Sequence, residues 1–204
     1  MPHVVLLGDS IFDNAKYVEP GPDVAAQLRE MVPAGWQVSL CAVDGAVTHH
    51  VLEQLSGLPA DATHLVLSVG GNDLLGCAGE LLRTPVTVSS EVFLLLARVA
   101  GGFEGTYRRV VDACLATGLP LVVCATYNGN FEDQVFQTMA RVAVAVFNDA
   151  ILRIALEKGL GAIDLRLVCA QAEDYANSIE PSVVGGRKIV EAILGMISLD
   201  KAGG

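Results

Sequence analysis

The residues Gly8-Asp9-Ser10 carry the first chemical signal in this sequence. They follow four consecutive apolar residues, 4–7, a pattern typical of a strand buried on both faces. A serine directly after such a strand lies where open α/β sheets bind ligands, so Ser10 is a candidate nucleophile. Asp and Ser also favour turns and helix N-caps, so a purely structural role for Ser10 is an equal alternative at this point.

Two further predicted strands end in residues whose chemistry suits such a serine. The patterns predict strands over 36–43 and 64–69; Gly45 follows the former, and Asn72 follows the latter. The carboxyl ends of parallel strands meet at one sheet edge, so we expect these residues to lie near Ser10. A serine that attacks a carbonyl needs donors for the developing oxyanion. The backbone N–H groups of Ser10 and Gly45 and the side-chain amide of Asn72 can supply them.

Strands alternate with helices along the chain. Apolar runs predict a fourth strand over 119–125 and a fifth over 160–165, and helical periodicity predicts helices over 24–32, 47–55, 92–114, 133–158 and 182–197. This alternation predicts a single α/β domain over 1–204, with a five-stranded parallel sheet and helices on both faces. The third helix contains Gly101, Gly102 and Gly105. Each glycine costs about 1 kcal/mol relative to alanine, so we expect a kink or a close helix contact there.

Composition narrows the class of protein. The chain has 204 residues, is 52% hydrophobic and 18% charged, and carries a formal net charge of −10. These values favour a globular fold and argue against a nucleic-acid partner, which requires a basic surface. The longest apolar segments fall short of the roughly 20 residues that cross a membrane, and we see no signal peptide. Five scattered cysteines indicate a reducing compartment, so we expect a cytoplasmic protein with no membrane partner.

The ordered set of strand-end motifs resembles the SGNH (GDSL-type) hydrolase family. Gly8-Asp9-Ser10, Gly45 and Gly70-Gly71-Asn72-Asp73 match the serine, glycine and asparagine markers of that family in order and spacing. The resemblance implies a three-layer α/β/α, flavodoxin-like fold and the hydrolysis of small carboxylic esters through an acyl-enzyme, without a metal or other cofactor. It also implies that Ser10 is the nucleophile and that Ser10, Gly45 and Asn72 form the oxyanion hole.

The fourth family marker, a histidine in an Asp-x-x-His segment near the C-terminus, is replaced in this chain. By alignment, Asn177 stands at the aspartate position and Glu180 at the histidine position, and no histidine follows residue 64. Three hypotheses result: Glu180 is the base, His49 or His50 is the base, or the protein is a catalytically impaired homologue that binds a small ligand. A carboxyl group has a reference pKa about 2 units below that of histidine, and burial of Glu180 would reduce that deficit.

The same sheet edge carries further polar residues. We expect substrate contacts from four of them, Asp9, Gly71, Tyr127 and Asn128. The edge also carries an acidic group, which is formed by Asp9, Asp13, Asp44 and Asp73. Such carboxylates can hold a divalent cation. More often they cap helices and tie loops together, so we predict no metal site.

Overall fold

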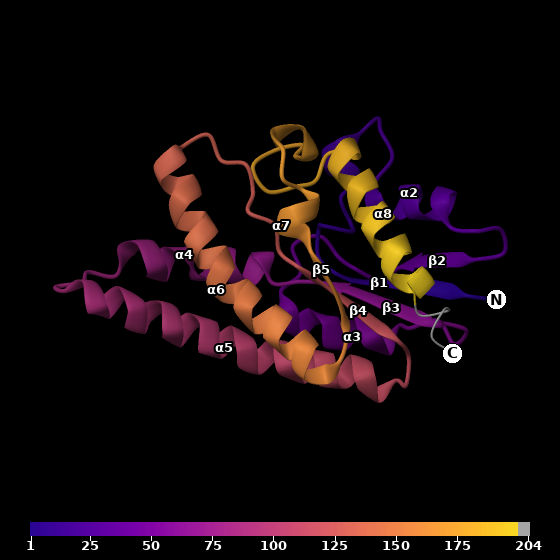
Figure 1. The fold of residues 1–204 in the computed structure, drawn as a ribbon, viewed down its shortest axis with the longest axis horizontal. Coiled ribbons are helices and arrows are strands. Elements are labelled where there is room, and N and C mark those ends of the chain that lie inside the picture. The colour runs from indigo at the N-terminus through magenta and orange to yellow at the C-terminus, as the bar shows by residue number, and fades with distance from the viewer. Residues whose placement is uncertain (200–204) are drawn as a thin grey trace.

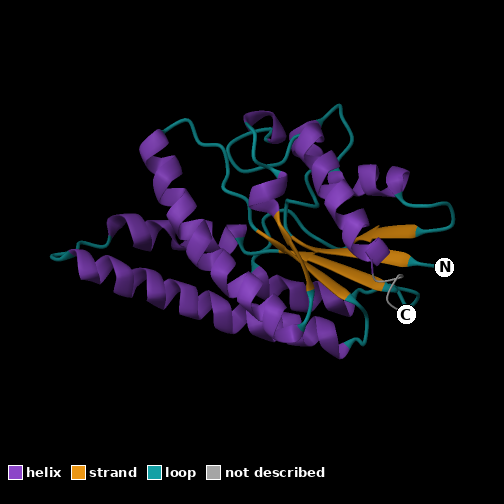
Figure 2. Ribbon diagram, in the orientation of Figure 1, coloured by secondary structure: helices purple, strands orange, loops and turns teal. Residues whose placement is uncertain are grey.

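The computed structural model describes residues 1–199 and contains one five-stranded sheet (Figure 2). All neighbouring strands pair in parallel, in the spatial order β2-β1-β3-β4-β5. The strands are β1 (His3–Gly8), β2 (Gln37–Leu40), β3 (His64–Ser68), β4 (Leu121–Ala125) and β5 (Gly161–Asp164). The predicted parallel α/β sheet is therefore confirmed. The strand order reverses between β1 and β3, and ligands bind at such a switch point in open α/β sheets.

Helices cover both faces of the sheet (Figure 1). One face packs against α2 (Val24–Met31), α7 (Leu165–Val168) and α8 (Val183–Leu199). The other packs against α3 (Val51–Ser56), α5 (Ser89–Ala116) and α6 (Gln134–Lys158). The remaining helices are α1 (Ala15–Val18) and α4 (Gly71–Arg83), with single 3₁₀ turns at Thr48–His50 and Ala172–Asp174.

The central strand β1 explains why the first apolar run does not alternate with polar residues. Val4 and Leu6 face the cluster that contains α2 and α8, whereas Val5 and Leu7 face the cluster that contains α5 and α6. All four side chains have no solvent-exposed surface. A strand with both faces in the core places its carboxyl end, and thus Ser10, in a fixed position.

Capping residues begin or end two helices at the positions that the sequence predicts. The Asp23 side chain caps α2 by accepting a hydrogen bond from the backbone N–H of Ala26. The Asp133 side chain caps α6, and Gly159 ends that helix in the left-handed conformation, with φ of +66°.

The second strand is shorter than the predicted segment 36–43. After Leu40, the N–H groups of Cys41 and Ala42 both donate to the carbonyl of Leu6, at 2.9 Å each. Two successive donors on one acceptor break the regular ladder, so the chain leaves the sheet there. The loop that carries Gly45 therefore begins earlier than expected.

Helix α4 has no counterpart in the sequence predictions. It starts immediately after β3, so Asn72 lies in the first turn of a helix. Three glycines within α4 and an N-cap without a side-chain hydrogen bond weaken the local helical signal. Together with the N-terminal halves of α5 and α6, α4 extends past the sheet (Figure 1).

The glycines of α5 do not make the expected close contact. A Cβ atom added at Gly101, Gly102 or Gly105 would meet no atom within 4 Å, and all three residues are exposed on one continuous helix. The contacts of α5 come instead from its opposite side, where Phe103 and Tyr107 are buried.

Candidate active site

Ser10 lies at the carboxyl end of β1 and donates a hydrogen bond to Glu180, with 2.9 Å between Oγ and Oε1. Gly8 makes the turn into this position, with φ of +129°, and a Cβ there would lie 1.8 Å from the Ser68 carbonyl oxygen. Only glycine fits such a close approach. Both partners of the hydrogen bond are buried, with exposed fractions of 8% for Ser10 and 3% for Glu180. The structure thus joins a hydroxyl and a carboxylate in a shielded setting.

A turn centred on Asn177 positions Glu180. The Asn177 side-chain oxygen accepts hydrogen bonds from the N–H groups of Ile179 and Glu180, at 2.9 and 3.0 Å. The Tyr127 hydroxyl donates to the Ile179 carbonyl at 2.6 Å. Asn177 therefore supports the backbone of this turn, and the Glu180 carboxylate is left to Ser10.

An ion pair between the buried Asp174 and the partly exposed Lys188 holds the segment that leads into this turn. Asp174 has no exposed surface and accepts from the Lys188 ammonium at 2.6 Å and from the Gln171 N–H at 3.0 Å. On the other side, the Asn14 side chain donates to the Pro181 carbonyl at 3.1 Å. These contacts connect the Glu180 segment both to α8 and to the loop that follows Ser10.

Burial changes the acid–base character of two carboxyl groups at the site. It raises the pKa of Glu180 from 4.5 to about 7; the Ser10 hydrogen bond and Lys16 oppose the increase, and the Asp44 charge adds to it. Burial also raises the pKa of Asp9 to about 7, against the hydrogen bond from the Ile11 N–H, and the Glu180 charge contributes. The second carboxylate oxygen of Glu180, Oε2, is buried without a hydrogen-bond partner in the described part of the chain.

The loop that carries Gly45 packs against the ends of β1 and α4. The Val43 N–H donates to the Gly8 carbonyl at 3.1 Å, and the Asn72 amide donates to the Ala46 carbonyl at 2.9 Å. Gly45 itself is exposed, with φ of +78°. The three predicted oxyanion residues therefore lie on adjoining segments, and the role of the Gly45 N–H stays a prediction.

The predicted acidic group is not gathered around one point. The Asp13 carboxylate accepts from the Asp44 N–H at 2.8 Å, and Asp44 accepts from the Tyr17 hydroxyl at 3.0 Å. Asp73 accepts from the N–H and hydroxyl of Thr48 at 2.9 and 2.8 Å. Within residues 1–199, no three metal-ligating side chains lie close enough together to hold a metal ion. These carboxylates tie loops together.

The two histidines proposed as alternative bases lie in a 3₁₀ turn. His49 is exposed, and the His50 Nδ1 atom accepts from the Val47 N–H at 3.2 Å. Their rings contact each other, with centroids 4.2 Å apart. The Ser10 hydroxyl donates to Glu180, so no contact supports the histidine hypothesis.

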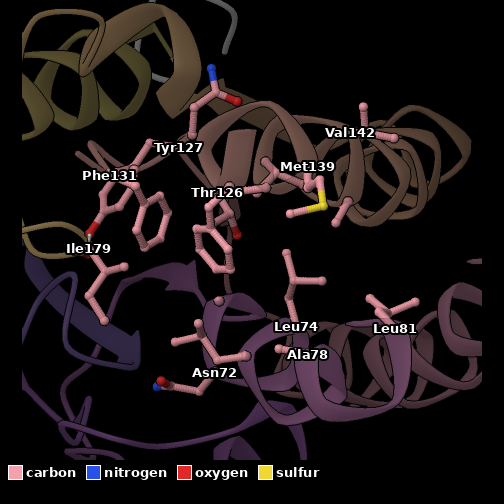
Figure 3. Close-up of a pocket in the computed structure, with 18 of the residues that line it drawn as sticks. Asn72, Leu74, Ala78, Leu81, Thr126, Tyr127, Phe131, Met139, Val142 and Ile179 are labelled. Carbon is pink, nitrogen blue, oxygen red and sulfur yellow. Dashed lines mark hydrogen bonds between the residues drawn. The ribbon is translucent and has the colours of Figure 1, made fainter. Parts of the chain in front are cut away.

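A cavity of about 340 Å³ opens beside Ser10 (Figure 3). Ser10, Asn72 and Glu180 line it, and Gly45 does not. The four residues predicted to contact substrate, Asp9, Gly71, Tyr127 and Asn128, all line it as well. The sequence patterns did not predict the apolar part of the lining, which includes Leu74, Ala78, Leu81, Met139 and Val142. The spacing of Leu74, Ala78 and Leu81 is a helical signal that could have revealed the α4 side of it.

Comparison with known proteins identifies the family. The model of the GDSL-like lipase/acylhydrolase family matches residues 6–185. The chain belongs to this family. The GDSL-like assignment makes it a carboxylic ester hydrolase by class, as the sequence predicts. No curated protein sequence matches the chain significantly.

Solved structures share the fold at low sequence identity. An extracellular lipase from Streptomyces rimosus is 16% identical, with a TM-score of 0.69, and the match covers 96% of this chain and 100% of that one. Phospholipase A1 from Streptomyces albidoflavus is 15% identical, with a TM-score of 0.67 and coverage of 96% and 98%. An acetylxylan esterase from Geobacillus stearothermophilus is 18% identical, with a TM-score of 0.67 and coverage of 96% and 93%. The SGNH fold predicted from the motifs is therefore confirmed.

Within residues 1–199, no helix combines the length and the apolar character needed to cross a bilayer.

Proposed function

We propose that this protein cleaves small-molecule carboxylic esters through an acyl-enzyme, with Ser10 as nucleophile and Glu180 as the general base. One observation carries the proposal: the Ser10 hydroxyl donates to the Glu180 carboxylate at 2.9 Å, at the end of a cavity. A nucleophile and a base within hydrogen-bond reach are the minimum arrangement for covalent catalysis by serine.

The raised pKa of Glu180 explains how a carboxylate can replace histidine. An efficient general base has a pKa near the working pH, and histidine has one of about 6.5. Burial gives Glu180 a pKa of about 7. The deficit expected from a free carboxylate, about 3 kcal/mol in proton-transfer driving force, is thereby removed.

The reaction follows from these positions. Glu180 takes the hydroxyl proton as Ser10 attacks the acyl carbon, and the N–H groups of Ser10 and Gly45 and the Asn72 amide stabilise the oxyanion. An amide carries two N–H bonds, so the contact with Ala46 uses one and leaves the other for the oxyanion. Protonated Glu180 then gives its proton to the departing alkoxide. In the second half, Glu180 deprotonates the water that hydrolyses the acyl-enzyme, and Ser10 is restored.

We place this hydrolase in the cytoplasm. None of its five cysteines forms a disulfide, and three of them, Cys114, Cys124 and Cys169, are buried. Free thiols of this kind persist in a reducing compartment.

Replacement of Glu180 tests the proposal. Glu180→Gln keeps the shape of the side chain, and an amide cannot accept the serine proton. We expect kcat for p-nitrophenyl acetate to fall by about 10²–10⁴-fold, the usual contribution of a general base. In the native enzyme, kcat/KM should fall as pH decreases through about 7, because the carboxylate becomes protonated.

Glu173→Gln is the matched control, because Glu173 is exposed in the same segment and the substitution removes the same charge. It should leave kcat and the pH profile unchanged. A Glu180→Gln enzyme with native kcat would reject the serine–glutamate mechanism. A native protein that turns over no ester at any pH would leave the impaired, ligand-binding homologue as the correct description.

A further inference from the structure

The cavity beside Ser10 continues as a groove along one face of α4, which we call the α4 groove. Leu74, Ala78 and Leu81 form its wall on α4, and Met139 and Val142 of α6 face them (Figure 3). The three α4 positions are three and four residues apart, so they share one helix face. The groove therefore starts at the nucleophile and leads away from it between two helices.

Charged groups are confined to one end of this cavity. Among the described residues, Asp9 and Glu180 are the only ionisable acidic or basic residues of the Asp, Glu, Lys, Arg and His types that line it, and both lie beside Ser10. Beyond Asn72, the lining side chains of α4 and α5 are all leucine, alanine or valine. These α4 and α5 side chains offer no hydrogen bonds to a sugar or a phosphate, whereas covering them with hydrocarbon is favourable.

The length of the groove sets the size of its ligand. Ten helical residues separate Asn72 from Leu82, and they rise about 15 Å along the axis. An extended hydrocarbon advances about 1.25 Å per carbon, from bonds of about 1.5 Å at an angle of about 111°. The groove thus spans a linear chain of roughly ten carbons or slightly more. Its far end reaches solvent, because Leu82 and Val92 are 50% and 41% exposed.

The direction of the reaction decides which part of the ester enters the groove. Glu180 must protonate the departing alkoxide, so the alcohol leaves on the Glu180 side. Figure 3 shows Ile179, the neighbour of Glu180, on one side of Asn72 and the groove residues Ala78 and Leu81 on the other. The acyl chain is the part that extends past Asn72 into the groove.

We propose that the α4 groove binds the acyl chain of the substrate, and that this esterase prefers linear acyl groups of roughly ten carbons over acetyl. This inference rests on the proposed function. It adds an acyl-chain length to the small carboxylic esters predicted from the sequence.

Blocking the groove tests the inference. In the native enzyme, kcat/KM for p-nitrophenyl esters should increase about fourfold per added methylene, until the groove is filled near the decanoyl ester. Ala78 lies six residues, or about 9 Å, beyond Asn72. Ala78→Phe should close the path there and exclude about three carbons of a decanoyl chain. The ratio of kcat/KM for decanoate to that for acetate should fall about 50-fold.

Gly79→Phe is the matched control. A Cβ at Gly79 meets no atom within 4 Å, so the same ring on the adjacent residue points to open space outside the groove. This variant should keep the native ratio. A native enzyme that prefers acetate, or an Ala78→Phe variant that keeps the native ratio, would overturn the acyl-chain assignment.

A binding measurement separates this inference from the proposed function. Titration of Ser10→Ala protein with decanamide, an uncharged acyl analogue, requires no turnover. Decanamide should bind at least about 100-fold more tightly than butanamide, and adding Ala78→Phe should remove most of that difference. If decanamide binds selectively but the native protein hydrolyses no ester, the proposed mechanism is rejected and the assignment of the groove to an acyl chain stands. Equal binding of both amides would reject the groove even in an active esterase.

Discussion

Within residues 1–199, Ser10 and Ser39 each lie within hydrogen-bond distance of a side chain that can accept a proton, and the surroundings of the two contacts differ. Ser10 pairs with Glu180 at the carboxyl end of β1. Ser39 in β2 lies 2.8 Å from the His3 Nε2 atom, and the His3 Nδ1 atom lies 2.9 Å from Asp61. The second group has the composition and the contacts of a Ser-His-Asp triad, whereas the first lacks the histidine.

The surroundings separate the two groups. The Ser10 pair borders a cavity of about 340 Å³ at the switch point of the sheet, next to the Asn72 amide. His3 begins β1, Asp61 precedes β3 and Ser39 lies within β2, and none of them lines that cavity. A nucleophile with its base is therefore insufficient to define a site. Space for a substrate and donors for the oxyanion are also required.

The largest expected effect contrasts the two serines directly. Ser10→Ala should lower kcat for p-nitrophenyl acetate by at least about 10⁴-fold, because it removes the nucleophile. Ser39→Ala should keep native kcat/KM, because Ser39 does not line the cavity. Steady-state rates of the two purified variants make the comparison. If Ser39→Ala were inactive and Ser10→Ala active, Ser39 and not Ser10 would be the nucleophile.

The second effect concerns Asn72, which we propose as an oxyanion donor in the Ser10 group. Asn72→Ala should lower kcat by about 10²–10³-fold and change KM much less, because the donor acts mainly in the transition state. Asn72→Asp is a useful companion, since it keeps the size and replaces the donor by an acceptor. Native kcat in Asn72→Ala would restrict this residue to its contact with Ala46.

The third effect is on stability. Between pH 4.5 and about 7, unfolded Glu180 ionises whereas the folded carboxyl keeps its proton, so this group lowers stability progressively as pH rises. Glu180→Gln removes the penalty. Its free energy of unfolding, relative to the native enzyme, should increase by about 2 to 3 kcal/mol from pH 5 to pH 8. Urea denaturation at both pH values measures this, and a pH-independent difference would contradict burial as the cause of the shift.

The smallest effect belongs to the exposed member of the second group. Asp61 has a 62% exposed side chain, and its hydrogen bond with His3 lowers its pKa. The contact therefore adds stability above the ordinary pKa of aspartate and loses it on acidification. Asp61→Asn should move the urea midpoint at pH 7 only slightly and leave kcat/KM unchanged. A measurable loss of activity would mean that the second group takes part in catalysis.

The same two regions indicate what the sequence can predict. The motif at Ser10 predicts its surroundings because each marker follows a buried strand, and parallel strands bring their carboxyl ends together. Glu180 could be placed only by its offset within a family segment. The contact between Ser39 and His3 has no such signal, since it depends on the register in which His3 pairs with Gln37.

Helix α4 shows a different limit. Its glycines weaken the helical pattern, and Leu74 and Leu81 are only partly buried against the core, so local propensity alone does not predict the helix. The cavity that α4 helps to form was therefore missed, although the residues at its polar end were predicted. A cavity is a property of several packed elements, and no single stretch of sequence encodes it.

The Ser10–Glu180 hydrogen bond joins residues that are 170 positions apart. Nearly all of the described chain, including four of the five strands, lies between them. A contact of such long range forms only after the intervening elements have ordered, because its loop-closure entropy must be offset by their packing. Enzyme activity then reports the completion of folding. In a refolding experiment, ester hydrolysis should return no earlier than the burial of the core. A partly folded form in which the Glu180 turn has not formed should have no esterase activity.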